Sequence, residues 1–329
     1  MQRRTFMAAA TGLLGLSAFC WPGAPVPGTV ERGEAIAPGR RLYRGADLAF
    51  GTTVTIQLVH DDEDRARAAI RDAFAQAHAI DRLMTVHRED SQVQLLNRHG
   101  RLDSPHPHLL AVLREALRLS VLTRGAFDIT VQPLWQATLG GIDRAAAHKL
   151  VGWRDVLAGE PEVRLRRAGM AITLNGIAQG YATDMALAAL QGHGISDALV
   201  DIGEFRGSGE RASARPWQVG IADPRSSCLL HAVRLDGRSL AISGDYETAF
   251  SGDLSRHHIV DPVSGDSPLE LACVGVAAPA AMLADGLSTA LMVMGSERGM
   301  ALASVWRGVD ALFVRKDGSE VWTKGFPLV

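Results

Sequence analysis

The sequence predicts an α+β fold in which mixed sheets pack against helices. Runs typical of strands and of helices interleave along the chain, but without the strict βαβ rhythm of a doubly wound parallel sheet. The chain has 329 residues, of which 47% are hydrophobic. A chain of this size can bury a large core, as one domain or as two tightly joined halves.

The first half of the chain contains the pattern of one strand followed by two helices. Residues 29–45 show no clear period, so we expect an irregular initial segment. The β-branched run 50–59 predicts a strand. Apolar residues at helical spacing predict a helix over 61–84. Ser104 and Pro105 are typical of a helix start, and the helix they begin should reach about Leu122.

The second half adds two further helices and most of the strands. A helix is expected over 175–190, ending before Gly192 and Gly194. Another should span 281–294 and continue beyond Gly295. Strands are predicted at 198–202, 217–221, 229–235, 239–242 and 271–277, and a final hairpin at 311–315 and 321–323.

The N-terminus has the pattern of an export signal. Arg3 and Arg4 precede an apolar run over 8–19 and a Pro/Gly-rich stretch. The paired arginines resemble a twin-arginine signal, with an ordinary secretory signal as the alternative. The run is shorter than the roughly 20 apolar residues of a membrane span, and the bulky Phe19 before Cys20 argues against a lipid anchor. We expect residues 1–28 to be the signal segment, residues 29–329 the mature domain, and the bacterial periplasm its location.

Charge and cysteine content narrow the classes of partner. The formal net charge is -2, from 34 basic and 36 acidic residues, which does not predict a nucleic-acid-binding face. Cys228 and Cys273 lie outside any spacing typical of a metal site, so we expect two buried free thiols.

Residues 243–247 (SGDYE) and 257–265 (HHIVDPVSG) bring hydroxyl, carboxylate and imidazole groups together between Gly and Pro turn signals. A loop rich in titratable groups is typical of a functional site. A polar surface hairpin is the alternative.

The sequence Gly176-Ile177-Ala178-Gln179-Gly180-Tyr181 lies at the predicted start of a helix. Glycines at a helix N-terminus let backbone N–H groups approach a phosphate. Alternatively, they only allow close packing of the helix.

Asp285, Ser288 and Thr289 have the i, i+3, i+4 spacing that places side chains on one face of a helix. A carboxylate with two hydroxyls suits Mg²⁺ better than zinc. The alternative is a capping Asp with hydroxyls that bond back to the helix.

Two further blocks contain weaker signals. In Gly125–Thr130, Phe127 could cover a ring and Asp128 could accept hydrogen bonds, or the block is a turn that enters a strand. In Thr85–Ser91, His87 could stack on a base or ring, or it is a surface residue.

Taken in order, these blocks resemble the ApbE family of FAD:protein FMN transferases. The resemblance runs from about Phe50 to Gly295. The matching segments are FGT, IDRLM with DS and LN, GAFDITVQPLW, NGIAQGYATD, ALVDIGE, SGDYE, HHIVDPVSG and ADGLSTALMVMG. It implies an ApbE-like (T-fold-like), two-lobed single unit.

The resemblance also implies a reaction and a set of site residues. Such enzymes bind FAD and Mg²⁺, transfer FMN to a Thr or Ser of an exported flavoprotein domain, and release AMP. His258 matches the reactive imidazole, with Asp261 close by. The metal would be held by Asp285, Ser288, Thr289 and the carbonyl of Ala178. Contacts to the flavin nucleotide would come from Phe50, His87, Ala126, Phe127, Asp128, Asn175, Tyr181 and Ile259.

The chain departs from the family pattern at several of these positions. Gln179 stands where Lys is usual, and Glu204 where a second Gly is usual. Thr173, Phe50 and His87 replace the usual Asp, Met and Tyr. These changes resemble a NosX-type branch associated with nitrous oxide respiration, whose acceptor would be a membrane flavoprotein. An Mg²⁺-dependent FAD pyrophosphatase and a non-catalytic flavin-binding partner protein are the alternative functions.

Overall fold

The computed structural model describes residues 25–140, 143–212, 215–226 and 228–329. The paired arginines, the apolar run and Cys20 of the predicted signal lie outside the described residues.

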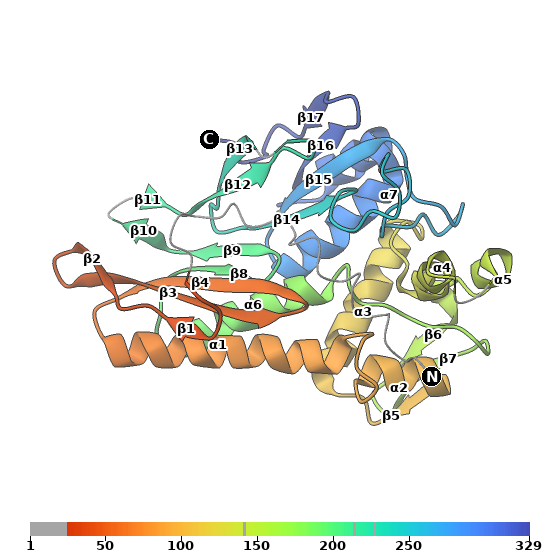
Figure 1. The fold of residues 1–329 in the computed structure, drawn as a ribbon, viewed down its shortest axis with the longest axis horizontal. Helices are drawn as coiled ribbons and strands as arrows, with labels where there is room; N and C mark the ends of the chain where they lie inside the picture. Colours follow the sequence, from red (N-terminus) through yellow and green to blue (C-terminus); the bar gives the residue numbers. More distant parts are fainter. Residues whose placement is uncertain (1–24, 141–142, 213–214, 227) are drawn as a thin grey trace, which may run out of the picture.

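A ten-stranded sheet forms the centre of the described chain (Figure 1). Its strands are β1 (Thr29–Val30), β2 (Glu34–Ala37), β3 (Arg40–Ala49), β4 (Thr52–His60), β8 (Asp197–Asp201), β9 (Phe205–Ser208), β14 (Ser239–Gly244), β15 (Leu271–Ala278), β16 (Asp310–Arg315) and β17 (Glu320–Trp322). The order is β1-β3-β4-β8-β9-β14-β15-β16-β17, and β2 pairs with β3. Every one of these pairings is antiparallel. The predicted α+β class is therefore confirmed.

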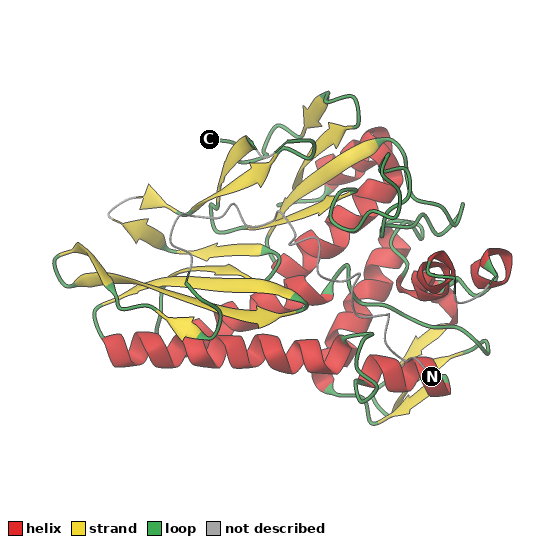
Figure 2. Cartoon of the chain, in the orientation of Figure 1, coloured by secondary structure: helices red, strands yellow, loops and turns green. Residues whose placement is uncertain are grey.

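Three long helices cover one face of this sheet (Figures 1 and 2). They are α1 (Glu63–Met84), α6 (Ala178–Gly192) and α7 (Ala281–Val305). The main hydrophobic core lies between these helices and the sheet, and includes Ile56, Leu58, Ile70, Ala186, Val274 and Leu287. Each large apolar side chain buried there contributes about 1.5–3 kcal/mol. This core holds α6 and α7 in a fixed position under the strands.

The opposite face of the sheet is covered by a hairpin of β12 (Gln218–Ala222) and β13 (Leu229–Arg234). Trp217, which is 1% exposed, packs there in a second core with side chains from the sheet, among them Leu199, Leu240 and Leu312. The short strands β10 (Glu210–Ala212) and β11 (Arg215–Pro216) pair with each other beside it.

A smaller lobe lies beyond the end of α1 (Figure 1). It contains α2 (Gln92–His99), α3 (Pro107–Leu122), α4 (Gln132–Thr138), α5 (Arg144–His148), the 3₁₀ turns η1 (Ile129–Val131) and η2 (Trp153–Asp155), and a sheet of β5 (Arg101–Asp103), β7 (Glu162–Leu165) and β6 (Val156–Ala158). The main core continues into this lobe through Leu113 and Val163. The two lobes therefore share one core, as expected of a two-lobed single unit.

Most of the predicted helices and strands are present, with shifted ends. The helix expected from Ser104 begins at Pro107, because His106 caps it through its ring. The prediction of an irregular segment over 29–45 was wrong, since β1, β2 and most of β3 lie there. β3 is covered on both faces, so its side chains lack the simple alternation that marks a half-buried strand. The predicted pair of buried thiols was also wrong, because Cys228 is exposed and only Cys273 is buried.

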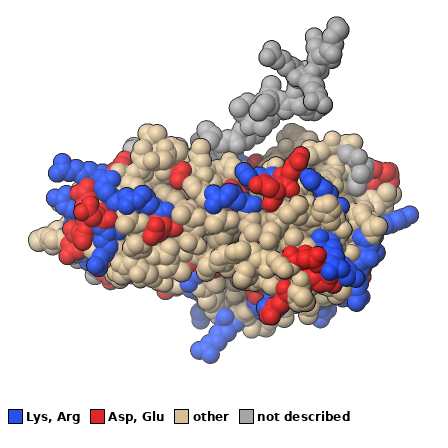
Figure 3. Space-filling view, turned by 90° about the horizontal axis from the view of Figure 1, so that it is seen from below, with Lys and Arg blue, Asp and Glu red and all other residues tan. Residues whose placement is uncertain are grey.

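Acidic and basic side chains are intermixed on the face seen from below in Figure 3. None of the helices in the described part of the chain combines the length and apolar character needed to cross a membrane.

Candidate functional site

The first turn of α6 lies directly against α7. A Cβ atom on Gly180 would be 2.3 Å from the carbonyl oxygen of Ala281 and 2.7 Å from Cβ of Asp285, so only glycine fits this approach. The N–H of Gly180 donates a 2.9 Å hydrogen bond to Oδ2 of Asp285. Close packing therefore explains Gly180. Its N–H is already bonded to Asp285, so it is not free for the phosphate that was the other prediction.

A carboxylate of α6 also caps the N-terminus of α7. The two oxygens of Asp184 accept hydrogen bonds from the N–H groups of Ala281, at 2.9 Å, and Met282, at 3.1 Å. Arg206 of β9 forms an ion pair with the same carboxylate. These contacts satisfy free N–H groups of α7 and fix its position along α6. No pattern in the sequence indicated this role for Asp184.

Hydroxyl groups gather beside Asp285. Oγ of Ser243, at the end of β14, lies 2.7 Å from Oγ of Ser288 and 3.4 Å from Oγ1 of Thr289. Oγ of Ser288 also donates to the carbonyl of Asp285 at 2.9 Å, which is the back-bonding expected in the alternative interpretation. Asp285 is not an N-cap, however, because α7 begins at Ala281. The structure thus brings three of the predicted metal ligands together near the first turn of α6, which begins at the fourth, Ala178.

Carboxyl groups near this cluster have raised pKa values. Burial raises the pKa of Asp285 to about 7, and the nearby Glu247 adds to this rise, while the N–H of Gly180 opposes it. Burial also raises the pKa values of Glu247 and Asp201 to about 7. Glu204 is 6% exposed, and its pKa lies well above the ordinary value because of burial and then because of the charges of Asp285, Glu247 and Asp201. Four acidic groups therefore influence one another in a poorly solvated region.

His258 is half-buried in the long connection between β14 and β15. Its backbone N–H donates to the carbonyl of Thr248 at 2.9 Å, and its ring Nδ1 is buried without a hydrogen-bond partner. Burial, and then the neighbouring His257 ring, lowers the pKa of His258 to about 4. The imidazole is therefore neutral near pH 7 and able to accept a proton.

The carboxylate of Asp261 is used within its own turn. It accepts hydrogen bonds from the N–H of Val263, at 2.9 Å, and from Oγ of Ser264, at 3.2 Å. These bonds fix the turn that follows His258, and a catalytic role for Asp261 stays a prediction.

A buried ion pair holds the connection that carries Glu247 and His258. Asp245 is completely buried, and both of its oxygens accept 2.8 Å hydrogen bonds from Arg225 in the β12–β13 hairpin. Nζ of Lys316 lies 3.3 Å from the same carboxylate and donates to the carbonyl of Leu254. Two basic side chains thus tie this connection to the rest of the fold.

The predicted flavin contacts lie on several elements. Phe50 has a positive φ of 53° and donates its N–H to Asp81 of α1, and His87 is exposed just beyond the same helix. Asn175 is exposed before α6, while the hydroxyl of Tyr181 lies 2.7 Å from Nδ1 of His108. Phe127, Tyr181 and Ile259 belong to the main core, and Phe50 and Ala126 pack against it. Their contacts with a flavin stay predictions.

Asp128 has a local structural role that sequence reasoning missed. Its Oδ1 accepts from the N–H and hydroxyl of Thr130, and its Oδ2 accepts from the N–H of Trp153 at 3.1 Å. It caps η1, so the block enters a 3₁₀ turn rather than the strand that was considered.

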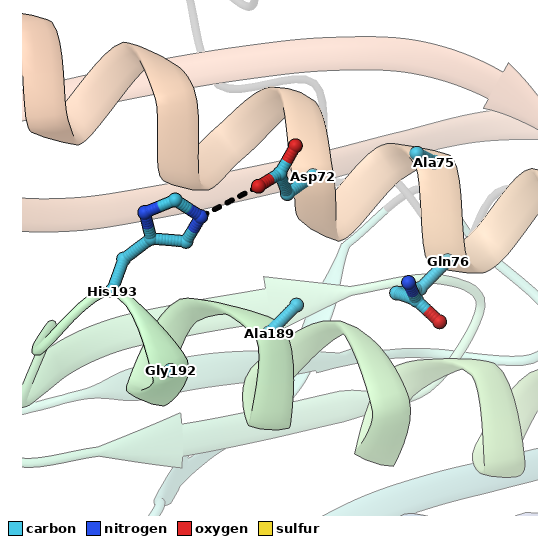
Figure 4. A pocket seen from close by; sticks show the side chains of 6 residues that line it. All are labelled: Asp72, Ala75, Gln76, Ala189, Gly192 and His193. Atoms are coloured by element: carbon cyan, nitrogen blue, oxygen red, sulfur yellow. Dashed lines mark hydrogen bonds and ion pairs between the residues drawn. The ribbon is translucent and has the colours of Figure 1, made fainter.

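A groove between α1 and α6 lies away from these residues (Figure 4). It is lined by Asp72, Ala75, Gln76, Ala189, Gly192 and His193. His193 and Asp72 form a 2.6 Å ion pair there. The groove is at the C-terminal end of α6, about 20 Å along the helix axis from Ala178 at about 1.5 Å per residue.

Comparison with known proteins identifies the family. The model of the ApbE family matches residues 50–313. The chain belongs to the ApbE family. It is 32% identical to an FAD:protein FMN transferase of Vibrio cholerae, with 82% of this chain and 86% of that protein covered. It is 30% identical to an FAD:protein FMN transferase of Treponema pallidum, with 84% and 85% covered.

Solved structures of ApbE proteins have the same fold. The flavin transferase ApbE from Vibrio cholerae has a TM-score of 0.77 at 26% identity and covers 87% of this chain and 98% of its own. The apo form of the Pseudomonas stutzeri flavinyl transferase ApbE has a TM-score of 0.76 at 29% identity, with 87% and 95% covered. The predicted ApbE-like architecture is therefore confirmed.

Proposed function

We propose that this ApbE-family chain transfers the FMN moiety of FAD to a Thr or Ser hydroxyl of an exported flavoprotein domain, with Mg²⁺ bound and AMP released. Its relatives are named FAD:protein FMN transferases, that is, for the transfer of FMN from FAD to a protein. Alignment over more than 80% of both chains supports the same activity here.

The contact between α6 and α7 is the observation that carries this proposal. The bond from Gly180 to Asp285 joins the first turn of α6 to the helix face that bears Ser288 and Thr289. A carboxylate, two hydroxyls and the start of α6, where Ala178 lies, thereby converge from segments about 100 residues apart in sequence.

The donor chemistry of these residues fits a hard cation. Asp285, Ser288, Thr289 and the carbonyl of Ala178 would hold Mg²⁺ through oxygen atoms, which this ion prefers. Within the described ranges, no three His, Cys, Asp or Glu side chains form a metal site by themselves. Hydroxyl and carbonyl oxygens would therefore have to complete the set. When bound, the cation would neutralise charge on the diphosphate of FAD.

His258 supplies the proton acceptor in this proposal. The hydroxyl oxygen of the acceptor attacks the phosphorus on the FMN side of the diphosphate and forms a phosphoester bond. The bond from that phosphorus to the bridging oxygen breaks, and AMP leaves with both bonding electrons. The neutral ring of His258 takes the hydroxyl proton, and such a base contributes about 10²–10⁴ in rate.

We also propose a periplasmic location and a membrane flavoprotein as acceptor, as in a NosX-type branch. The paired arginines and the departures at Gln179 and Glu204 support this assignment. The ordinary secretory signal remains the alternative route of export.

The direct test mixes the purified protein with FAD, Mg²⁺ and a candidate acceptor domain. Covalent flavin fluorescence on the acceptor in a denaturing gel is expected, with loss on chelation and recovery with excess Mg²⁺. Release of FMN and AMP without acceptor would instead indicate a pyrophosphatase. Intact FAD after long incubation would indicate a flavin-binding partner protein.

Replacing His258 tests the base. His258→Ala should keep FAD binding and lose most transfer, by about 100-fold or more. His193→Ala, which removes an imidazole from the distant groove, is the matched control and should transfer normally. Near-normal transfer by His258→Ala would exclude His258 as the base.

A further inference from the structure

Glu204 lies in the turn between β8 and β9, and its side chain is buried. It is 6% exposed, and its Oε2 has no hydrogen-bond partner. Its backbone carbonyl accepts a 3.3 Å bond from Oγ1 of Thr183 on α6. The preceding Gly203 has a φ of 92°, and a Cβ there would be 2.3 Å from Nε2 of Gln179. The turn is thus packed against the first turns of α6.

The groups that act on Glu204 electrostatically are carboxyls. Asp285, Glu247 and Asp201 each raise its pKa, in addition to burial. Within the described part of the chain, no Lys, Arg or His forms an ion pair with Glu204 or Asp285. The α6 side chains that contact this turn are the neutral Gln179, against Gly203, and Thr183, against the carbonyl of Glu204. A buried carboxylate without a basic partner is costly, so the ionised form of Glu204 needs a compensating charge.

We propose that Glu204 is a second carboxylate partner of the divalent cation bound at Asp285, bonded to it directly or through a coordinated water. This inference rests on the cation of the proposed function and adds a ligand to it. Mg²⁺ sites commonly use one or two carboxylates together with water and phosphate. One carboxylate would come from α7 and the other from the β8–β9 turn, so the cation would join the sheet to both helices.

The unpartnered oxygen distinguishes Glu204 from Asp201, the other carboxyl of the same turn. Oδ1 of Asp201 accepts the N–H of Gly203 at 3.1 Å, so this carboxyl has a structural partner in the same turn. Asp201 also acts on Glu204 but is not among the groups that act on Asp285. Asp201→Asn is therefore a matched control that removes a nearby carboxyl without removing the proposed ligand.

The test is a titration of Mn²⁺ or Mg²⁺ into the purified protein without FAD or acceptor, followed by calorimetry. Glu204→Gln, which preserves shape, should weaken cation binding by about 10-fold or more, since one factor of 10 corresponds to only about 1.4 kcal/mol. Asp201→Asn should change it by less than about 3-fold. Unchanged affinity in Glu204→Gln, or equal weakening in both variants, would overturn the proposal.

Thermal unfolding gives a second readout that does not depend on activity. Without cation, Glu204→Gln should unfold at a higher temperature than the wild type, because the cost of burying this carboxyl is removed. Added cation should then raise its midpoint less than it raises that of the wild type. An equal rise in both proteins would contradict the proposal. If the wild type binds no cation either with or without FAD, the Mg²⁺ part of the proposed function fails instead, which separates the two failures.

Discussion

Asp245 and Glu204 are both buried carboxylates, but their partners differ. The carboxylate of Asp245 accepts hydrogen bonds from Nη1 and Nη2 of Arg225 and lies beside Nζ of Lys316. Glu204 faces other carboxyls, and one of its oxygens is unpartnered. A buried carboxylate paired with basic groups fixes the fold, because its charge is already compensated. A carboxylate without a basic partner remains available for a ligand, which is the role proposed for Asp285 and Glu204.

The largest effect on activity is expected at Asp285, which has no basic partner among the described residues. Asp285→Asn keeps the side-chain shape but removes the charge that would hold the cation, so transfer of FMN should fall by at least about 100-fold, or about 2.7 kcal/mol of barrier. The gel assay with FAD, Mg²⁺ and acceptor measures this. If Asp285→Asn transfers FMN at the normal rate, Asp285 does not hold a cation that the reaction needs, and its lack of a basic partner has no functional meaning.

The largest effect on stability is expected at Asp245, which is paired with Arg225 and Lys316. Asp245→Asn leaves Arg225 and Lys316 without their carboxylate and should lower the free energy of unfolding by about 3 kcal/mol. Denaturant unfolding of wild type and variant provides the measurement. A loss below about 0.5 kcal/mol would mean that this ion pair does not hold the fold.

Substitution of a glycine at each end of α6 compares the stability of the end packed on α7 with that of the end away from it. Gly180→Ala places a methyl group against the backbone of α7 and should cost about 2–3 kcal/mol. In Gly192→Ala the added methyl group has no atom within 4 Å, so this change should be neutral or stabilising by about 0.5 kcal/mol. Chemical denaturation of both variants, with cation titration of each, separates the two ends. Equal effects would contradict the close packing at Gly180.

A smaller effect is expected from pH. Asp201 and Glu247 have pKa values near 7 in the fold, raised by burial, and the pKa of Glu204 is also raised. Between about pH 4 and pH 7 the folded protein therefore holds more protons than the unfolded chain, and its cation-free stability should fall as pH rises. The lowered pKa values of His108, His257 and His258 act in the opposite direction. They are outnumbered, because the pKa values of Asp128 and Asp285 are raised as well.

Thermal unfolding at pH 5 and pH 8, each with chelator and with Mg²⁺, measures this dependence. Mg²⁺ should stabilise the protein more at pH 8, where the carboxyls have lost their protons. Glu204→Gln should flatten the cation-free profile. A cation-free protein that becomes more stable from pH 5 to pH 8 would contradict the assigned directions.

Local features of the site could be read from the sequence, whereas contacts between distant segments could not. The spacing of Asp285, Ser288 and Thr289 places them on one helix face whatever the rest of the chain does. The 2.7 Å contact of Ser288 with Ser243 depends on how α7 lies under β14, and no local pattern encodes that. In the sequence, Glu204 stood out only as a departure from the family pattern, and its contact with α6 is visible only in the fold.

The fold shows the same division. The long helix α1 follows from periodicity, because one of its faces is apolar over many turns. The first half of α7 is instead apolar and buried on most of its sides. β3 was missed because helices cover one of its faces and other side chains the opposite one, which removes the alternation. The cap formed by Asp128 could have been predicted from the sequence. An Asp side chain commonly accepts a hydrogen bond from the backbone N–H two residues later, as it does here from Thr130.

The most direct measurement is a crystal structure of the protein grown with FAD and Mn²⁺, with anomalous scattering used to locate the metal. We expect an anomalous peak within about 2–2.3 Å of the Asp285 carboxylate, between it and the FAD diphosphate, with Glu204 turned toward the same peak. FAD bound with no metal at Asp285, or with the diphosphate held elsewhere, would contradict the central claim.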